Sequence, residues 1–254
     1  MLYGIHPVRE ALRVRGHRFK EIWVSRSSVS GPVKELLEEA IGLGIKIRSC
    51  EREQLENKAG KVRHQGILAF LAPYTYATLE DILTAARQQD PAFILLLDGI
   101  QDPQNLGALI RSAHLCGVHG VIIPKHRAGG LTAGVHKASA GALEHVPVAR
   151  VTNLAATIGV LKQQAIWVVG LAMEGEQLLF EVDFTQPTAL VIGSEAAGIR
   201  PLVKRSCDLL AAIPQLGELN SFSASAAGAM AMYEVMRQRF KFSGQREQCP
   251  PAPE

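Results

Sequence analysis

Hydrophobic residues follow two different patterns along the chain, one before residue 73 and one after residue 91. In the first stretch, apolar residues at helical spacing predict a helix over residues 31–44, and Pro7 is placed to begin another. Three stretches have the composition of strands: residues 19–25, 44–50 and 66–72. Together these elements predict a small α/β domain over residues 1–72.

Strand patterns and helix patterns alternate from residue 92 to residue 242. Six apolar stretches predict strands: residues 93–98, 118–124, 145–151, 165–172, 188–193 and 209–214. Three of the helices expected among them cover residues 106–116, 133–143 and 223–240. Near-continuous apolar strands that alternate with helices predict an α/β fold with a parallel sheet covered on both faces.

Two further stretches complete the predicted organisation of the chain. Residues 73–91 are expected to form a linker that contains a short helix at residues 78–87. Residues 243–254 are expected to be a disordered tail. We therefore predict two domains, residues 1–72 and residues 92–242, joined by residues 73–91.

Composition narrows the class of protein. The chain has 254 residues, of which 47% are hydrophobic and 20% charged, as expected for a packed globular protein. No apolar run approaches the length of a membrane span, and no signal peptide is expected because Arg9 and Glu10 interrupt the N-terminus. The four cysteines are scattered without a C-x-x-C pair, which is typical of reduced thiols in the cytoplasm.

Charge is unevenly shared between the two predicted domains. Residues 1–72 hold 13 Lys and Arg against 8 Asp and Glu, whereas the remainder holds 14 against 16. This asymmetry indicates an anionic partner for the N-terminal part. The densest basic cluster consists of Arg13, Arg15, Arg18 and Lys20. The cluster fits either a solvated helix end or a surface that contacts RNA phosphates.

Three loops follow predicted strands at the edge of the sheet where ligands of parallel α/β proteins bind. They lie within residues 98–113, 193–198 and 213–230. The second loop does not fit a dinucleotide, because Glu195 takes the place of the middle glycine in G-x-G-x-x-G. The sequence also lacks a Walker A motif. A ligand without phosphates, such as an adenosine that carries a cationic group, suits these loops better.

At these loops the chain resembles the SpoU-type RNA ribose 2′-O-methyltransferases of the SPOUT superfamily. The residues that carry the resemblance are N-x-G-x-x-x-R-S-A at 105–113, V-I-G-S-E-A-A-G-I-R-P at 191–201 and I-P-Q-L-G-E-L-N-S-F-S-A-S-A-A-G at 213–228. Residues 3–12 and 64–69 resemble the small L30e-like RNA-binding domain that precedes the catalytic domain in some members. That longer form is similar to the bacterial enzymes that methylate a guanosine ribose in 23S rRNA.

The resemblance implies a knotted catalytic domain, a methyl donor and a homodimer. It implies a trefoil knot near the C-terminus of that domain, with S-adenosylmethionine held inside it. By position, Gly193, Ile213, Phe222 and Ser223 are expected to bind the methyl donor. By position again, Asn105, Arg111, Glu195 and Ser221 are expected to form the catalytic neighbourhood.

Four of these positions carry further expectations: Asn105, Arg111, Phe222 and Ser223. Arginine is hard to deprotonate in proteins, so we expect Arg111 to act as a cation that binds phosphate and stabilises developing alkoxide charge. Asn105 is expected to cap the helix that carries it. In the third motif Ser223 stands where the family usually has Asn, and Phe222 stands where it has Leu. Serine is shorter than asparagine and offers one hydroxyl in place of an amide.

The sequence also bears on a metal site, on a further contact with RNA and on two other functions. The histidines show no metal-ligand spacing, so no metal site is expected. Lys125 and Arg127 lie in a basic loop that is either solvated or in contact with RNA. The runner-up function is a tRNA ribose 2′-O-methyltransferase, although the N-terminal domain favours rRNA. A non-catalytic RNA-binding or ribosome assembly protein is the alternative outside the enzyme class.

Overall fold

The computed structural model describes the chain except for residues 30, 61, 63, 90, 218–220 and 244–254. The side chains at positions 15, 17 and 241–243 are also outside the described part. The predicted disordered tail therefore lies outside the described residues, apart from Ser243 at the end of the last helix. The backbone divides into two compact units.

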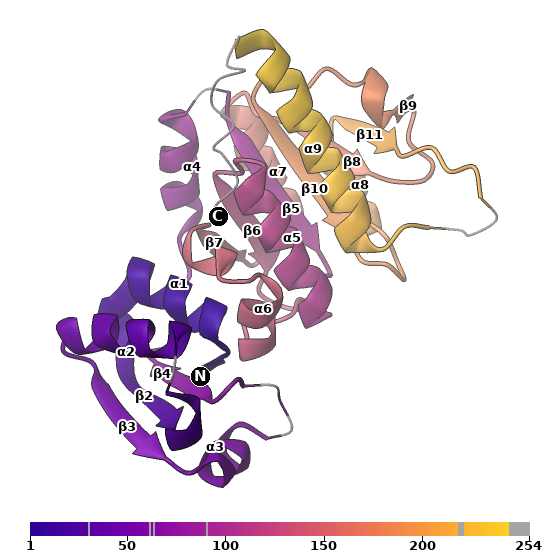
Figure 1. Ribbon diagram of the computed structural model, residues 1–254. Helices are drawn as coiled ribbons and strands as arrows, with labels where there is room; N and C mark the ends of the chain where they lie inside the picture. Colours follow the sequence, from indigo (N-terminus) through magenta and orange to yellow (C-terminus); the bar gives the residue numbers. More distant parts are fainter. Residues whose placement is uncertain (30, 61, 63, 90, 218–220, 244–254) are drawn as a thin grey trace. The chain divides into compact units, whose positions relative to one another are not determined.

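The first unit contains Met1–Tyr76 together with Asp102–Arg111 and Gly129–Pro147. Its sheet has the order β1-β4-β2-β3 (Figure 1). The strands are β1 (Leu2–Tyr3), β2 (Phe19–Ser25), β3 (Lys46–Cys50) and β4 (Ile67–Leu71). β4 runs antiparallel to β1 and β2, whereas β2 and β3 are parallel.

Helices cover the two faces of this sheet unequally. The helices of the N-terminal segment are α1 (Ile5–Arg15), α2 (Pro32–Gly42) and α3 (Arg52–Ala59). One face packs Ile22 and Val24 against buried residues of α1 and α2 in the main core. The other face packs Leu68 against Leu55 of α3 in a much smaller cluster. The predicted strands of this unit are confirmed within two residues at each end, whereas β1 and α3 were not predicted.

The second unit contains Ala77–Gln101, Ser112–Ala128 and Val148–Glu254. Its seven-stranded sheet has the order β7-β6-β5-β10-β8-β11-β9, and every pair is parallel. The strands are β5 (Phe93–Asp98), β6 (Gly120–Pro124), β7 (Val148–Val151), β8 (Trp167–Leu171), β9 (Gln177–Leu178), β10 (Thr188–Gly193) and β11 (Leu209–Ala212). The predicted α/β fold with a parallel sheet is confirmed.

The core of the second unit lies on both faces of the sheet. Its helices are α4 (Leu79–Arg87), α7 (Leu154–Gln163), α8 (Pro201–Ser206) and α9 (Ala224–Ser243). Residues of α4, α7 and α8 pack with Ile94, Leu96 and Val191 in one cluster. α9 packs along β10, and Figure 1 shows it crossing the front of the sheet. Since β5 and β10 are covered on both faces, their sequences are almost wholly apolar.

Two helices extend between strands in the middle of the chain, and one prediction there is wrong. α5 (Pro103–Leu115) follows β5, and α6 (Ala133–Ala138) follows β6. The continuous helix predicted over residues 133–143 ends at Ala138 and is followed by a separate 3₁₀ helix at Ala142–Glu144. Ala140 and Gly141 have φ of 51° and 94°, a left-handed conformation that ends a helix.

Among the described residues, none of the helices combines the length and the apolar character that a bilayer crossing requires.

Candidate active site

The loop that follows β10 is closed on itself at the carboxyl end of the sheet. Ser194 and Gly198 exchange two backbone hydrogen bonds of 3.1 and 2.8 Å. A Cβ atom on Gly193 would lie 2.1 Å from the carbonyl carbon of Gly198, so only glycine fits there. Gly198 has a φ of 62°, which also favours glycine. The two glycines of G-x-E-x-x-G are therefore required by the turn itself.

A buried carboxylate holds the far end of this loop. Asp98, the last residue of β5, has a fully buried side chain, accepts two hydrogen bonds from Arg200 and forms an ion pair with it. One comes from the backbone N–H at 2.8 Å, and the guanidinium Nε and a terminal nitrogen each lie 2.7 Å from Oδ1. Charge-assisted bonds of this kind are the stronger ones in proteins. Asp98 and Arg200 thus fix the loop between β10 and α8 to the end of β5.

Two side chains cap the N-terminus of α9. Glu195 accepts a hydrogen bond of 3.2 Å from the backbone N–H of Ala224. Ser223 accepts one of 3.2 Å from the N–H of Ala226, which is the usual N-cap contact. Glu195 from the second loop and Ser223 from the third therefore act on the same helix end, where a carboxylate is also favoured by the helix dipole.

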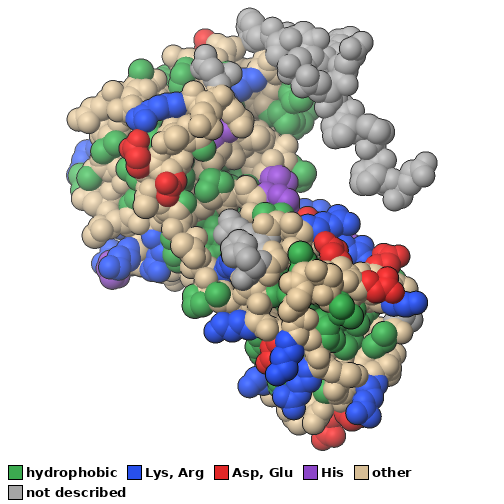
Figure 2. All heavy atoms as spheres, turned by 90° about the vertical axis from the view of Figure 1, so that its left-hand side faces the viewer, with side chains coloured by type: hydrophobic (Ala, Val, Ile, Leu, Met, Phe, Trp, Pro, Cys, Tyr) green, Lys and Arg blue, Asp and Glu red, His purple; other side chains and the backbone are tan. Residues whose placement is uncertain are grey.

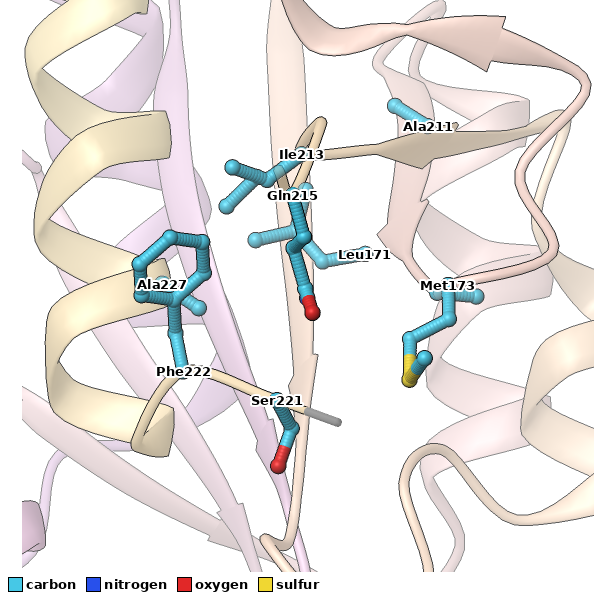
Figure 3. A pocket seen from close by; sticks show the side chains of 9 residues that line it. Leu171, Met173, Ala211, Ile213, Gln215, Ser221, Phe222 and Ala227 are labelled. Atoms are coloured by element: carbon cyan, nitrogen blue, oxygen red, sulfur yellow. The ribbon is translucent and has the colours of Figure 1, made fainter. Parts of the chain in front are cut away.

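Two adjoining cavities, of about 100 and 400 Å³, lie beside these loops. Figure 3 shows the smaller cavity, with Leu171, Ile213 and Phe222 pointing into the same space from separate segments. Gly193 and Glu195 line the larger one, and Ser221 and Phe222 line both. Apolar walls with a few polar groups are typical of small-molecule sites of this size.

The four residues predicted to bind the methyl donor therefore lie in one region of the second unit. Gly193, Ile213 and Phe222 line the cavities, and Ser223 is adjacent to them at the start of α9. Of the residues predicted for catalysis, Glu195 and Ser221 line the larger cavity. Asn105 and Arg111 lie on α5 in the first unit, where Arg111 is exposed and Asn105 half-buried.

The expectation that Asn105 caps α5 is wrong. The cap is Asp102, whose carboxylate accepts a hydrogen bond of 2.9 Å from the backbone N–H of Asn105. Pro103 then occupies the first helical position, where its missing N–H costs nothing. The amide side chain of Asn105 is therefore not the group that caps this helix.

The residues predicted to contact RNA differ in their exposure. Arg13, Lys20, Lys125 and Arg127 are exposed, and the side chain of Arg15 lies outside the described part. Arg18 is buried, and its guanidinium lies 3.5 Å from the carboxylate of Glu144 and donates to the carbonyl of Ala72. Arg18 thus faces the interior of the first unit.

Sequence reasoning missed several residues of the site. Arg200 was not singled out, because its pairing with Asp98 joins positions 102 residues apart. Leu171 and Met173 line both cavities, and Glu174, which lines the larger one, forms an ion pair with Lys204. The sequence marks Leu171, Met173 and Glu174 only by their position at or just after the end of the buried strand β8.

Two further observations concern clusters of metal-ligating side chains and the state of one thiol. Within the part of the chain that the structure describes, no three His, Cys, Asp or Glu side chains are grouped so as to hold a metal ion. Burial raises the pKa of the Cys207 thiol to about 12, so this thiol stays protonated at neutral pH.

Comparison with known families identifies the class of protein. Residues 92–233 match the SpoU rRNA methylase family, and residues 1–77 match the RNA 2′-O ribose methyltransferase substrate-binding family. The chain belongs to the SpoU rRNA methylase family.

Individual relatives cover nearly the whole chain. YacO of Bacillus subtilis, which carries the name of a TrmH-family tRNA/rRNA methyltransferase, is 43% identical over 93% of this chain and 94% of its own. The 23S rRNA (guanosine-2′-O-)-methyltransferase RlmB of Escherichia coli K12 is 38% identical over 94% and 98%. The structure of AviRb from Streptomyces viridochromogenes in complex with AdoMet is 25% identical, with a TM-score of 0.78 over 94% of this chain and 89% of that one.

Proposed function

We propose that the protein transfers a methyl group from S-adenosylmethionine to the ribose 2′-OH of a guanosine in 23S rRNA. The observation that carries this proposal is the loop-lined cavity at the carboxyl end of the sheet, in a chain of the SpoU rRNA methylase family. The similarity to RlmB, which extends over both family regions, supports 23S rRNA as the substrate. The AdoMet complex of AviRb supports the methyl donor.

The residues around the cavities fit S-adenosylmethionine. A space of about 400 Å³ beside apolar walls suits an adenosine, and Gly193 and Gly198 of the closed turn line this space. Gly193, Ile213, Phe222 and Ser223 are the residues that we propose hold it. When bound, it supplies a strongly electrophilic methyl group.

Three of the four side chains proposed for catalysis act on the nucleotide, and the fourth acts on the protein. Its 2′-OH is a poor nucleophile until its proton leaves, so the hydroxyl must be oriented and its developing charge stabilised. Arg111 is exposed on α5 and stays a cation, which suits it to bind the nucleotide phosphate and stabilise the alkoxide. We assign Asn105 and Ser221 to orienting the nucleotide by hydrogen bonding. We assign Glu195 to holding the start of α9 beside the cavity.

The proposal extends to the organisation of the protein. Residues 1–72 form an L30e-like RNA-binding domain, residues 73–91 a linker and residues 92–242 a knotted SPOUT catalytic domain. Two chains form a homodimer through the knotted region. The position of β10 between β5 and β8, with the loop before α9 returning to the turn after β10, supports a knot at that place. The enzyme works in the cytoplasm, where its rRNA substrate is made.

The proposed role of Arg111 is tested by separating methyl transfer from binding of the donor. Arg111→Ala should reduce kcat for methyl transfer by about 100-fold or more, because a charge-stabilising group is lost. Its Kd for S-adenosylmethionine, measured by calorimetry, should not change. Arg205→Ala, which removes an exposed arginine from α8, is the matched control and should keep full activity. Full activity in Arg111→Ala would overturn this assignment.

A second candidate substrate is tRNA, because the name of YacO includes both tRNA and rRNA. The two substrates are distinguished by offering each to the enzyme separately with methyl-labelled S-adenosylmethionine. Label that enters tRNA and not rRNA would leave the chemistry unchanged and replace the proposed substrate.

A further inference from the structure

One face of the four-stranded sheet in the first unit carries aromatic side chains on neighbouring strands. Trp23 of β2 and Phe70 of β4 lie with ring centroids 5.2 Å apart and ring planes inclined by 56°. Both side chains are half-buried. The α3 residue Leu55 packs against Leu68 in the small cluster to which the two rings also belong. Aromatic rings thus remain partly open to solvent on a sheet face that α3 covers incompletely.

Three cations lie against the aromatic rings of this face. The guanidinium carbon of Arg48 is 4.5 Å from the centroid of the Trp23 ring, and the Lys58 ammonium is 6.0 Å from it. The Lys137 ammonium lies 5.3 Å from the Tyr3 ring. All three cations are exposed, and none has an ion-pair partner among the described residues. Their charges are therefore available to an anionic ligand.

Strand register places these groups in one row across the sheet. Tyr3 is opposite Leu68, Leu68 is opposite Trp23, and Trp23 is opposite Arg48. Adjacent strands are about 4.8 Å apart, so Tyr3 and Trp23 are separated by about 10 Å along the row. The nearest carboxylate in the register is Glu21, which lies opposite Lys46 on β3 and opposite Phe70 on β4. The row therefore presents two aromatic positions and an excess of positive charge.

We propose that this aromatic face, defined by Tyr3, Trp23, Arg48, Lys58, Phe70 and Lys137, binds an unpaired stretch of the RNA substrate. Bases stack on Trp23 and Phe70, while the three cations contact phosphates. Unpaired bases expose the flat surfaces that aromatic and guanidinium groups recognise, whereas a duplex hides them. The inference rests on the proposed function for the identity of the RNA. The match of residues 1–77 to a substrate-binding family supports placing this contact in the first unit.

Fluorescence of Trp23 tests the stacking directly. The chain has two tryptophans, so Trp167→Phe in the full-length protein leaves Trp23 as the only indole emitter. We would titrate this protein with a single-stranded RNA of about 12 nucleotides and with the same strand annealed to its complement. The single strand should quench Trp23 in a saturable way, and the duplex should bind more weakly. Equal binding of the duplex, or no quenching by either, would overturn the proposal.

Substitutions test the contribution of the charge and the ring. Arg48→Ala should weaken binding of the single strand about fivefold or more and reduce the slope of affinity against salt. Trp23→Leu should weaken it by a similar factor. The control Lys34→Ala removes an exposed cation from α2, which packs on the other face, and should bind as the parent does. Because Arg48 is exposed, its replacement leaves the core intact, so unchanged affinity in Arg48→Ala would contradict the proposal.

Methyl transfer to 23S rRNA, measured in the same proteins, separates this inference from the proposed function. If the parent methylates rRNA and the aromatic-face variants bind RNA as tightly as the parent, only the inference fails. If the parent does not methylate rRNA but its Trp23 is quenched by single-stranded RNA, only the proposed function fails. A protein partner on this face would leave Trp23 fluorescence unaffected by RNA, which also contradicts the inference.

Discussion

Ser223 replaces the asparagine that is usual in the family, and the structure gives it a capping role. Its hydroxyl accepts a hydrogen bond from the backbone N–H of Ala226 at the start of α9. Serine and asparagine are about equally good N-cap residues. The substitution therefore preserves the contact that positions the helix end beside the cavity, although the amide itself is lost.

We predict that Ser223→Ala destabilises the protein by about 1 kcal/mol, because the N–H of Ala226 loses its acceptor. Ser223→Asn should leave the free energy of unfolding unchanged. Urea denaturation of the three proteins measures both effects. Equal stability of Ser223→Ala and the parent would show that the cap contributes nothing.

Asp98 acts at the same edge through a buried charge. We predict that Asp98→Asn lowers the free energy of unfolding by roughly 2–3 kcal/mol, because hydrogen bonds to a buried charged group from Arg200 are weakened. The released loop should also raise KM for S-adenosylmethionine more than it lowers kcat. Arg205→Ala serves as the control for loss of a nearby surface charge. A variant with lowered kcat and unchanged KM would contradict a positioning role.

At the scale of elements, a buried ionic cluster joins the 3₁₀ helix at Gly16–Arg18 to the 3₁₀ helix at Ala142–Glu144. The Glu144 carboxylate lies 3.5 Å from Arg18 and 3.2 Å from Nδ1 of His136. The Arg18 guanidinium also lies 5.4 Å from the centroid of the Tyr74 ring. Segments more than a hundred residues apart in the sequence are held together here by charge as well as by apolar packing.

A double-mutant cycle on Arg18 and Glu144 tests this cluster. Arg18→Met leaves Glu144 buried without its charged partner and should cost about 3 kcal/mol of stability. Arg18→Met combined with Glu144→Leu should cost clearly less than the sum of the single changes, with a coupling of about 1 kcal/mol or more. Chemical denaturation of the four proteins gives the coupling. Additive effects would mean that the two side chains do not stabilise each other.

His119 makes the stability of the second unit sensitive to acid. Its Nδ1 accepts a hydrogen bond from the backbone N–H of Phe93 at the start of β5. Burial, assisted by the Arg239 guanidinium, lowers the pKa of His119 below its usual value. Between that lowered pKa and about 6.5 the unfolded chain binds a proton that the folded chain does not. The contribution of His119 to the free energy of unfolding should therefore be fully present above about pH 6.5. It should decrease as the pH drops below that value.

The variant His119→Asn should show a smaller loss of stability between pH 7.5 and pH 5.5 than the parent. The slope should not vanish, because burial also lowers the pKa of His64. Replacement of the exposed His6 by Asn is the control and should keep the slope of the parent. If His119→Asn loses as much stability as the parent over this interval, His119 is not a source of the acid sensitivity.

Elements with a one-sided or wholly apolar burial pattern could be predicted from the sequence. β5 and β10 were placed residue for residue because every strand position except the final Gly193 is buried. α3 was missed because Leu55 is its one buried residue, which leaves no periodic pattern to detect. The sequence predicted which loops form the site, but it did not predict which side chains pair within it. The contact between Asp98 and Arg200 joins distant positions and depends on tertiary packing. The burial of Arg18 in the first unit could not be predicted for the same reason.

At the scale of the whole molecule, the excess of positive charge in residues 1–72 acquires a structural context. On the face shown in Figure 2, Lys and Arg side chains lie at several places on the surface of the N-terminal part, with Asp and Glu side chains among them. Arg18 is not among the exposed cations, so the basic cluster near residue 13 is smaller at the surface than its sequence indicates. Exposed cations on β3 and α3 contribute instead, and Lys137 of α6 adds to them from outside residues 1–72. This distribution agrees with an RNA substrate held by phosphate contacts.

Methyl transfer to a ribose of 23S rRNA is the reaction that the fold, the cavity and the family together indicate. The most direct measurement incubates the purified protein with methyl-labelled S-adenosylmethionine and 23S rRNA, followed by digestion to nucleosides and mapping of the label. The account predicts 2′-O-methylguanosine as the labelled nucleoside and loss of the label in Arg111→Ala. Label on a base, label confined to tRNA, or no label despite bound S-adenosylmethionine would contradict it.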